Sequence, residues 1–557
     1  MVHWLIVRTS RPEGVDARLT PLLDGDCSSS GLEAVERTLW WSQDRGTAAA
    51  IWTDDRQARW VLDEDGSLLA MTGHAVAPGR AAGPGVRPIL RAEGAAACRD
   101  LDGMFTAISL RADGRGWIRS DRFGLSPVYR ADVGDHVVLA NRPADVAAVV
   151  RACTGLEPRR DSATIRHVAV LGTAFGDRSG FAGIRRVANR HDVDFGTGGG
   201  TREVEVWSRP WEPDRWAASD DPKALLDGVQ QRLVDGLRTI VEASTAPVEA
   251  ELTAGTDSRL VLALARLAGV ESQLHFHTFG SPEADDARVA QRISRDIGLA
   301  WEMRRARTSE ASVDAFVDRV RSTSGEFGAG GLVPPREGTL LLSGIMGEAL
   351  SAKYVNFIPR FTLHAIRRQR RVLSQVQPYP TAKAVRRTMR EVAAEMGRIA
   401  RDGCPPDALM DVFYLRQRER RWVGARPDRW DRNLFPLYSP DAIVANLQLP
   451  AARRQDALIH RTIIERADLP WDISSAGLPP APPPDDGVDR PVMKPVMQEL
   501  LALCRDSPGL EFVNLVALSG AVERYSELPR VPRQKVTDAL TALVWANPTL
   551  CAATVDR

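Results

Sequence analysis

A strand, a loop of small residues and an amphipathic helix follow one another between residues 248 and 268, and this succession constrains the fold more than any other feature. Residues 248–252 read as a short strand. The helix is indicated by apolar residues at helical spacing, namely Leu260, Val261, Leu264 and Leu267. The three segments together predict one β-α unit.

The same alternation extends in both directions along the chain. An apolar stripe at helical spacing precedes the unit, a strand is predicted at residues 274–279, and a helix begins near Asp285 and Asp286. Alternating strands and helices predict a parallel sheet. Beyond Tyr354 the sequence is typical of helices. One clear amphipathic face there consists of Val385, Met389, Val392, Met396 and Ile399.

The first two hundred residues are instead rich in predicted strands. Strands are expected at residues 1–7, 48–52 and 137–140. Residues 104–110 and 116–120 are expected to form a hairpin, because Asp113-Gly114 supplies a favourable turn between them. A glycine run and then a stretch rich in Trp and Pro follow near residue 200. We therefore place a domain boundary there, with domains at 1–205 and 206–557.

Composition excludes several classes of protein. The 557 residues carry a formal net charge of +1, which gives no general attraction to nucleic acid or to anionic membranes. The N-terminus does not resemble a signal peptide, and no apolar run is long enough to span a bilayer. The scattered cysteines fit a cytoplasmic protein without a disulfide framework. The basic stretch between Arg367 and Arg390 lacks interleaved aromatic residues, so we expect a solvated helix surface and no nucleic-acid partner.

The loop after residue 252 has the properties of a phosphate site. The first amides of a helix lack internal acceptors and carry partial positive charge. Thr253, Ala254, Gly255 and Ser258 are small, so phosphate oxygens can approach the backbone, and Asp257 is a suitable Mg²⁺ ligand. The alternative is a purely structural strand-turn-helix corner.

This loop resembles the S-G-G-x-D-S pyrophosphate loop of the asparagine synthetase family. Thr253, Gly255, Asp257 and Ser258 stand at the matching positions, while Ala254 replaces the first glycine. The resemblance implies a C-terminal adenine-nucleotide α-hydrolase (PP-loop) domain that uses ATP and Mg²⁺. The residues it implies for nucleotide binding are Leu252, Thr253, Ala254, Gly255, Thr256, Asp257, Ser258, Thr278, Phe279, Gly280, Ser343 and Gly344.

Two further segments match the family in the expected order. Residues 275–280 resemble the strand whose end lines the adenine pocket, and residues 284–299 the helix after it. Residues 342–348 resemble the L-S-G-E-G-S-D segment, whose final acid binds metal. The resemblance implies a metal pair of Asp257 and Glu348; the alternative for Glu348 is a solvated glutamate at a helix start. The implied catalytic residues are Asp257, Ser258, Arg259 and Glu348.

The N-terminal part also resembles this family. Residues 101–105 and 120–129 are similar to two core segments of its Ntn-type, glutaminase-like β-sandwich domain. The resemblance therefore implies a two-domain protein, α+β followed by α/β, with a class II glutamine amidotransferase-like domain at 1–205. Glutamine-hydrolysing members carry a nucleophilic cysteine after the initiator methionine, whereas this chain has Val2. Valine has no nucleophilic atom, so we expect a scaffold or partner surface without glutaminase activity.

Two other departures concern proton chemistry and amide formation. Ile345 stands where the family has Glu or Tyr, and isoleucine cannot move a proton. A peptide α-amine, with a pKa of about 7.7–8.0, needs less help from a base than a lysine amine. The family's late lysine is also missing from the aligned segment, residues 471–478. Lys494 could replace it only if the preceding proline-rich loop folds back, and an exposed surface lysine is the simpler interpretation.

These departures resemble the lasso peptide cyclases within the family. Residues 255–259 match their G-x-D-S-R loop, and Gly347-Glu348 matches the end of their second motif. The resemblance implies ATP-dependent macrolactam formation on a linear core peptide, with a leader peptidase and a leader-recognition protein as partners. The cationic, aromatic cluster after residue 413 either lines the site or is a helix with one solvated face. Its members are Tyr414, Arg416, Arg420, Arg421 and Trp422.

Two alternatives remain open at this stage. One is a small-molecule amide-forming synthetase, similar to a β-lactam synthetase or an ammonia-dependent asparagine synthetase. The other is a scaffold protein that keeps the ATP-binding fold without catalysis. The loss of a base at Ile345 and of the late lysine is compatible with both.

Overall fold

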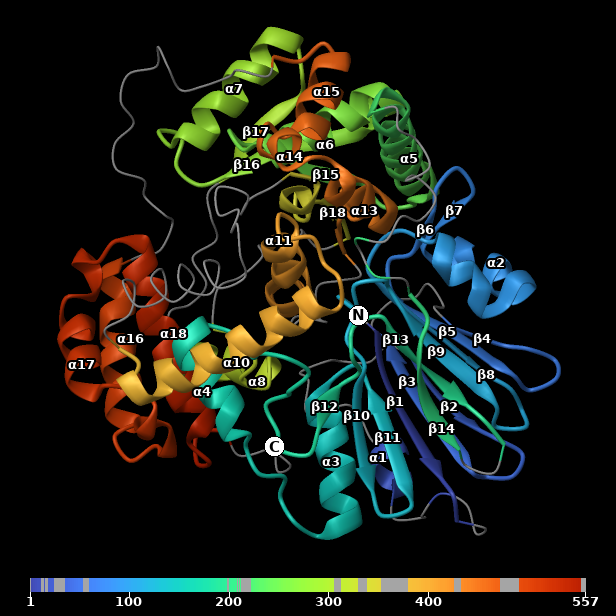
Figure 1. Ribbon diagram of the computed structural model, residues 1–557, viewed down its shortest axis with the longest axis vertical. Helices are drawn as coiled ribbons and strands as arrows, with labels where there is room; N and C mark the ends of the chain where they lie inside the picture. Colours follow the sequence, from blue (N-terminus) through green and yellow to red (C-terminus); the bar gives the residue numbers. More distant parts are fainter. Residues whose placement is uncertain are drawn as a thin grey trace.

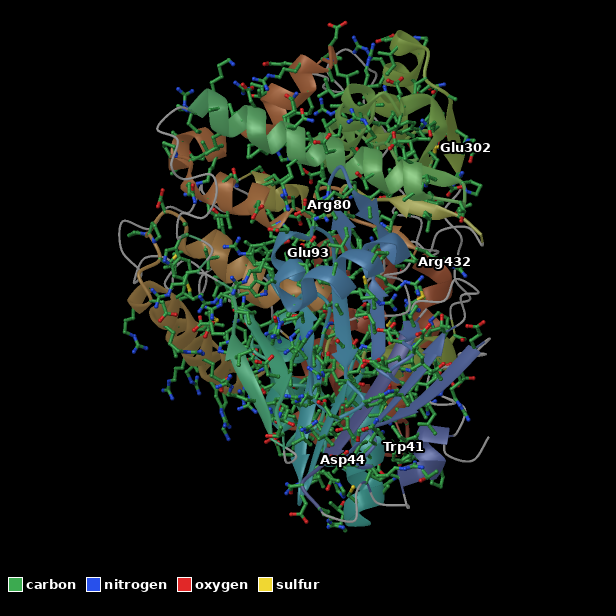
Figure 2. All side chains as sticks on the ribbon, turned by 90° about the vertical axis from the view of Figure 1, so that its right-hand side faces the viewer. Trp41, Asp44, Arg80, Glu93, Glu302 and Arg432 are labelled. Carbon is green, nitrogen blue, oxygen red and sulfur yellow. The ribbon has the colours of Figure 1, made fainter. Side chains whose placement is uncertain are left out.

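The computed structural model describes residues 2–11, 15, 19–24, 36–53, 60–197, 200–207, 209, 211, 222–304, 312–328, 338–351, 379–424, 432–470 and 490–551. The chain is a mixed α/β protein with several sheets (Figure 1). Figure 2 places Asp44, beside the turn of an N-terminal hairpin, and Glu302, on a strand of the C-terminal sheet, at opposite ends of the molecule.

Two antiparallel six-stranded sheets form the N-terminal part. The first has the order β12-β10-β11-β1-β3-β2 and the second β14-β13-β9-β8-β5-β4. The first comprises β1 (Val2–Thr9), β2 (Glu36–Trp41), β3 (Thr47–Thr53), β10 (Tyr129–Val133), β11 (His136–Ala140) and β12 (Arg185–Arg186). The second comprises β4 (Trp60–Leu62), β5 (Leu68–Gly73), β8 (Phe105–Leu110), β9 (Gly116–Ser120), β13 (His191–Phe195) and β14 (Thr201–Glu205).

The two sheets pack face to face. Trp4 and Ile51 of one sheet and Ile108 and Ile118 of the other belong to one buried apolar cluster. Alternating side chains put the remaining apolar residues of each strand on the outer faces. Helices α1 (Thr20–Asp24), α3 (Pro143–Thr154) and α4 (Ser162–Leu171) cover the first sheet, and α2 (Arg87–Glu93) covers the second. The predicted β-sandwich and its β8–β9 hairpin are confirmed.

A five-stranded parallel sheet organises the C-terminal part, as the alternating pattern predicts. Its order is β17-β16-β15-β18-β19, so successive strands run outward from β15 on one side and then on the other. The order therefore reverses between β15 and β18, and in open α/β sheets ligands bind outside the carboxyl ends of strands at such a point. The strands are β15 (Val248–Glu251), β16 (Leu274–Phe279), β17 (Trp301–Arg304), β18 (Leu340–Leu342) and β19 (Asn433–Leu434).

Helices pack with this sheet around a second apolar core. Val248 and Ala250 of β15 are buried together with Leu260 and Leu264, which lie on the helix after the loop. The central β-α unit is thus held by ordinary burial of apolar surface. The helices are α5 (Pro222–Ala243), α6 (Thr256–Ala268), α7 (Asp285–Ile297), α13 (Pro440–Gln448), α14 (Ala451–Gln455) and α15 (Leu458–Arg466).

The remaining C-terminal helices pack against the N-terminal part. One buried cluster joins apolar residues of α4 with those of the last helix, and Arg166 of α4 binds the carboxylate of Glu391 at 2.7 Å. In the described part of the chain, none of the helices is long and apolar enough to cross a membrane. The helices are α8 (Val313–Ser322), α10 (Ala382–Arg401), α16 (Arg490–Leu503), α17 (Leu515–Glu523) and α18 (Arg530–Ala546).

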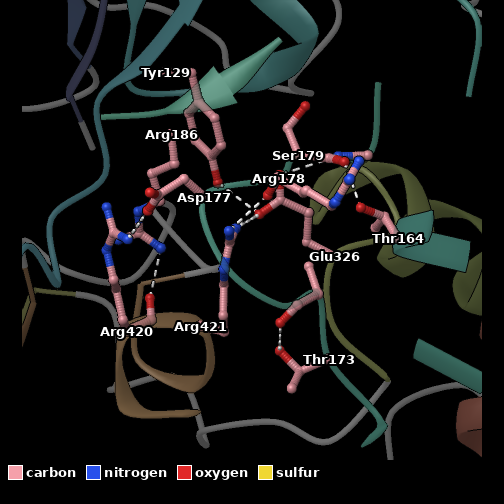
Figure 3. A network of polar contacts seen from close by, with 12 residues as sticks. Tyr129, Thr164, Thr173, Asp177, Arg178, Ser179, Arg186, Glu326, Arg420 and Arg421 are labelled. Atoms are coloured by element: carbon pink, nitrogen blue, oxygen red, sulfur yellow. Dashed lines mark hydrogen bonds and ion pairs between the residues drawn. The ribbon is translucent and has the colours of Figure 1, made fainter. Parts of the chain in front are cut away.

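A buried polar network also joins the two halves (Figure 3). The hydroxyl of Tyr129, on β10, donates to Glu326 at 2.8 Å, and Arg421 forms an ion pair with the same carboxylate. Arg420 pairs with Asp177. Arg420 and Arg421 lie on α12 (Arg420–Trp422) and are 3% and 1% exposed. Arg421 also donates to the carbonyls of Gly176 and Arg178, so both arginines join the C-terminal helices to the N-terminal part. The interpretation of them as site-lining or solvated side chains is wrong.

Candidate active site

The loop between β15 and α6 is held in a tight, internally bonded conformation. The backbone N–H of Thr253 donates to Ser258 Oγ at 3.0 Å, and the two hydroxyls lie 2.9 Å apart. The backbone N–H of Gly255 donates to Thr253 Oγ1 at 3.0 Å. Gly255 is the N-cap residue of α6. Ser258 is buried, so its hydroxyl acts mainly to shape the loop.

The loop presents backbone donors toward the end of the sheet. Thr256, Asp257 and Ser258 supply the first three amides of α6, for which a helix contains no acceptor. The N–H of Ala254 donates to a carboxylate oxygen of Asp286 at 3.0 Å. An anionic group therefore already lies against this loop, which is the behaviour expected of an anion site at a helix N-terminus.

The loop after β18 packs directly on the first turn of α6. A methyl group at Gly347 would lie 2.5 Å from Cγ of Asp257, and one at Gly344 would lie 2.9 Å from the backbone nitrogen of Ser258. Contacts this close leave room only for glycine. Met346, between them, has φ of 75°, a conformation uncommon for a residue with a side chain. The two loops flanking the point where strand order reverses thus meet at Asp257.

Each of the two proposed metal ligands contacts a polar side chain from a helix distant in sequence. Asp257 is 36% exposed and lies 2.9 Å from Nε2 of the fully buried His460, on α15. Glu348, in the turn Gly347–Leu350, accepts a hydrogen bond of 3.0 Å from the hydroxyl of Tyr414. Tyr414 belongs to the cluster selected from sequence. His460 was not selected, because nothing near it in the chain distinguishes it.

The strand end at Thr278, Phe279 and Gly280 lies beside the loop. Thr278 is buried; its hydroxyl donates to the carbonyl of Leu252 at 2.5 Å and accepts from Trp301 Nε1 at 2.9 Å. Its side chain therefore fixes β16 to the start of the loop, which leaves the partly exposed Phe279 and Gly280 as the accessible positions here. Leu252 is completely buried and takes part through its backbone.

Arg259 and Ile345 have roles that the sequence did not reveal. Arg259 is 6% exposed, and its Nη1 donates to the carbonyl of Pro470 at 3.3 Å. It holds the chain just before the aligned late segment, residues 471–478, which lies outside the described residues. Ile345 belongs to the buried apolar core of the C-terminal part. The side chain at this position therefore serves apolar packing and offers no group for proton transfer.

Lys494 lies apart from this site. It is on α16, 3.9 Å from Glu523 of α17. Figure 1 shows these two helices grouped with α18 and well separated from β15 and α6. The simpler interpretation of Lys494 as a surface lysine is therefore favoured. The proline-rich stretch near residue 480 lies outside the described residues.

The residues present fit a magnesium nucleotide better than a resident metal. Within the described ranges, no group of three or more His, Cys, Asp and Glu side chains is arranged to hold a metal ion. Mg²⁺ commonly takes one or two carboxylates and completes its shell with waters and substrate phosphates. Asp257 and Glu348, beside the first amides of α6, suit that arrangement.

Comparison with known proteins adds little to this description. No family model matches the chain, and no curated protein matches it. One similar structure is that of the allosteric regulatory enzyme of purine biosynthesis. The match covers 56% of this chain and 81% of that enzyme's chain, at 9% sequence identity and a TM-score of 0.22. A second is glutamine phosphoribosylpyrophosphate amidotransferase from B. subtilis, complexed with ADP and GMP. The match covers 61% of this chain and 74% of that chain, at 8% sequence identity and a TM-score of 0.22. Similarity this low supports no functional conclusion.

Proposed function

We propose that this protein is an ATP-dependent amide-forming ligase that adenylates a carboxylate. The observation that carries the proposal is the contact between Gly347 and Asp257, which brings two motif-bearing loops together where the strand order reverses. A ligand at this point meets helix amides from one loop and carboxylates from both. This combination suits the triphosphate of ATP.

In the proposed reaction, a substrate carboxylate attacks the α-phosphate of ATP and displaces pyrophosphate. The amides of Thr256, Asp257 and Ser258 bind the pyrophosphate oxygens, and Ser258 keeps the loop in shape. Asp257 and Glu348 would hold Mg²⁺, which neutralises charge on the leaving pyrophosphate. An amine then attacks the acyl-adenylate and expels AMP. Activation is required because a free carboxylate is a poor electrophile.

We further propose that the protein is a lasso peptide cyclase, in which an Asp or Glu side chain of a linear core peptide is joined to that peptide's own N-terminal amine. The G-x-D-S-R loop at residues 255–259 and the Gly347-Glu348 pair support this assignment. Val2 makes glutamine an unsuitable nitrogen source, which favours a nucleophile carried by the substrate. A leader peptidase and a leader-recognition protein would supply the cleaved peptide.

The test is ATP–pyrophosphate exchange with linear peptides that carry one internal Asp or Glu. We expect exchange that depends on the peptide carboxylate, and a product lighter by one water in mass spectrometry. An N-acetylated peptide should support exchange without losing water, whereas an Asn or Gln peptide should support neither. Asp257→Asn should abolish exchange while leaving the fold intact.

Other outcomes separate the alternatives. Exchange with small amino-acid substrates and none with peptides would favour a small-molecule synthetase. Failure to bind ATP in the presence of Mg²⁺ would favour a non-catalytic scaffold. An Asp257→Asn protein with undiminished exchange would contradict the metal assignment.

A further inference from the structure

Glu251 is an unassigned carboxylate at the centre of the candidate site. It is the last residue of β15, the strand that precedes the phosphate-binding loop, and it lies beside the point where the strand order reverses. A charged side chain is unusual at the end of a central parallel strand, because such strands are commonly buried on both faces. The residue as a whole retains partial exposure.

Glu251 is connected to the loop that lost its acid/base residue. Ser343 Oγ donates to Oε2 of Glu251 at 3.2 Å. The same hydroxyl accepts the backbone N–H of Ile345 at 3.4 Å. A carboxylate on the neighbouring strand therefore lies next to the loop position where the related enzymes are expected to carry Glu or Tyr.

Among the described residues, the charged groups nearest Glu251 along its own strand are engaged with one another. Glu249, on the same face of β15, forms a bidentate ion pair with Arg304, with N–O distances of 2.7 and 2.9 Å. Burial and Arg304 lower the pKa of His277, opposite Glu251 on β16, to about 4, so this histidine is neutral near pH 7. Burial raises the pKa of Glu251 itself, while the bond from Ser343 lowers it in part. A carboxylate in this state is a better proton acceptor than an exposed one.

We propose that Glu251 accepts the proton of the attacking amine during amide formation. The amine nitrogen forms a bond to the acyl carbon of the adenylate, and the bond from that carbon to the phosphate oxygen breaks. AMP leaves with the electron pair, and the proton released from nitrogen goes to Glu251 and then to solvent. This inference rests on the proposed ligase function, since it assigns a residue to its second half-reaction.

The experiment separates the two half-reactions in Glu251→Gln. Glutamine is isosteric and can still accept the Ser343 hydrogen bond, so the loop should keep its shape. ATP–pyrophosphate exchange reports adenylation, which needs no base, and mass spectrometry reports macrolactam formation. We expect exchange within about twofold of the unmodified protein and lactam formation lowered about 10²- to 10⁴-fold.

Two additional measurements test the role of the proton. Hydroxylamine is less basic than a peptide α-amine, so its nitrogen loses its proton to water more readily once it is bonded to the acyl carbon. Hydroxamate formation should therefore be lowered much less than lactam formation in Glu251→Gln. Glu251→Asp should recover part of the lactam formation, because it restores a carboxylate. The control is Glu271→Gln, which changes a partly exposed glutamate in the turn Glu271–Gln273 before β16, at the opposite end of the sheet.

The outcomes for Glu251→Gln and for the unmodified protein test the base and the ligase function separately. If Glu251→Gln loses exchange as well, the carboxylate serves nucleotide or metal binding and the proposal is wrong. If it keeps both activities, the carboxylate takes no part in proton transfer and the proposal is also wrong. Absence of exchange in the unmodified protein, with every peptide and small substrate, would instead contradict the ligase function.

Discussion

Nε2 of His460 lies 2.9 Å from Oδ1 of Asp257, and this contact joins α15 to the first turn of α6 across 203 residues of sequence. A carboxylate oxygen accepts hydrogen bonds, and the contact is satisfied by the tautomer of His460 that carries its proton on Nε2. His460 is completely buried, which fixes the position of its ring. The histidine therefore orients the carboxylate that is proposed to bind Mg²⁺.

Replacing His460 should weaken the response to magnesium. Removing a group that orients a metal ligand typically lowers metal affinity or activity about 10- to 100-fold. We expect His460→Ala to raise the Mg²⁺ concentration for half-maximal ATP–pyrophosphate exchange by that factor, and His460→Gln to recover part of it. The exposed His275, replaced by Ala, is the control. An unchanged Mg²⁺ titration would exclude the orienting role.

Gly347→Ala should displace Asp257. The added methyl group would lie 2.5 Å from Cγ of Asp257 and 2.7 Å from its Cβ, so either the loop or the carboxylate must move. We expect at least a tenfold loss of exchange activity. Gly397→Ala, in α10, is a matched control because its methyl group would meet nothing within 4 Å. Equal exchange activity in the two variants would contradict the proposed packing of the loops.

Arg421→Met should destabilise the protein by breaking a buried ion pair. Arg421 and Glu326 are each 1% exposed, so removing the guanidinium leaves a carboxylate buried without its cation. Breaking a buried pair in this way typically costs about 3–5 kcal/mol. Denaturant unfolding should show this loss, and adding Glu326→Gln should recover part of it. Lys223→Ala, which removes an exposed pair on α5, should change stability by less than about 1 kcal/mol.

Glutamine should not be hydrolysed by this protein. β1 begins at Val2, whose side chain offers no nucleophile. We expect glutamate release at the level of buffer alone, measured beside an authentic glutaminase as a positive control. Release that rises in proportion to protein concentration would show that another residue acts as nucleophile.

Predictions from sequence were most accurate where the pattern is local. The β8–β9 hairpin follows from Asp113-Gly114, and the α/β alternation correctly gives β15, α6 and β16. The edge strands β2 and β14 were not predicted, because partly exposed and charged residues interrupt the apolar alternation. Edge strands favour such residues, since charge discourages pairing with other chains.

The candidate site was predicted only in part. The loop at residues 252–259 is recognisable from residue size and order, and Glu348 from its motif. The Arg420–Arg421 pair was misassigned, because a charged helix face looks the same in sequence whether water or a buried carboxylate covers it. Burial depends on what packs against a helix, which its own periodicity does not specify.

The sequence by itself determined the β-α loop of small residues and the presence of Val2 and Ile345, whose side chains can act neither as nucleophile nor as base. Those properties depend on residue identity and on short-range spacing. Only the tertiary structure decided that His460 meets Asp257 and that Glu251 lies beside the Ser343–Ile345 loop. Such contacts join segments about a hundred or two hundred residues apart, and they arise from the packing of whole strands and helices.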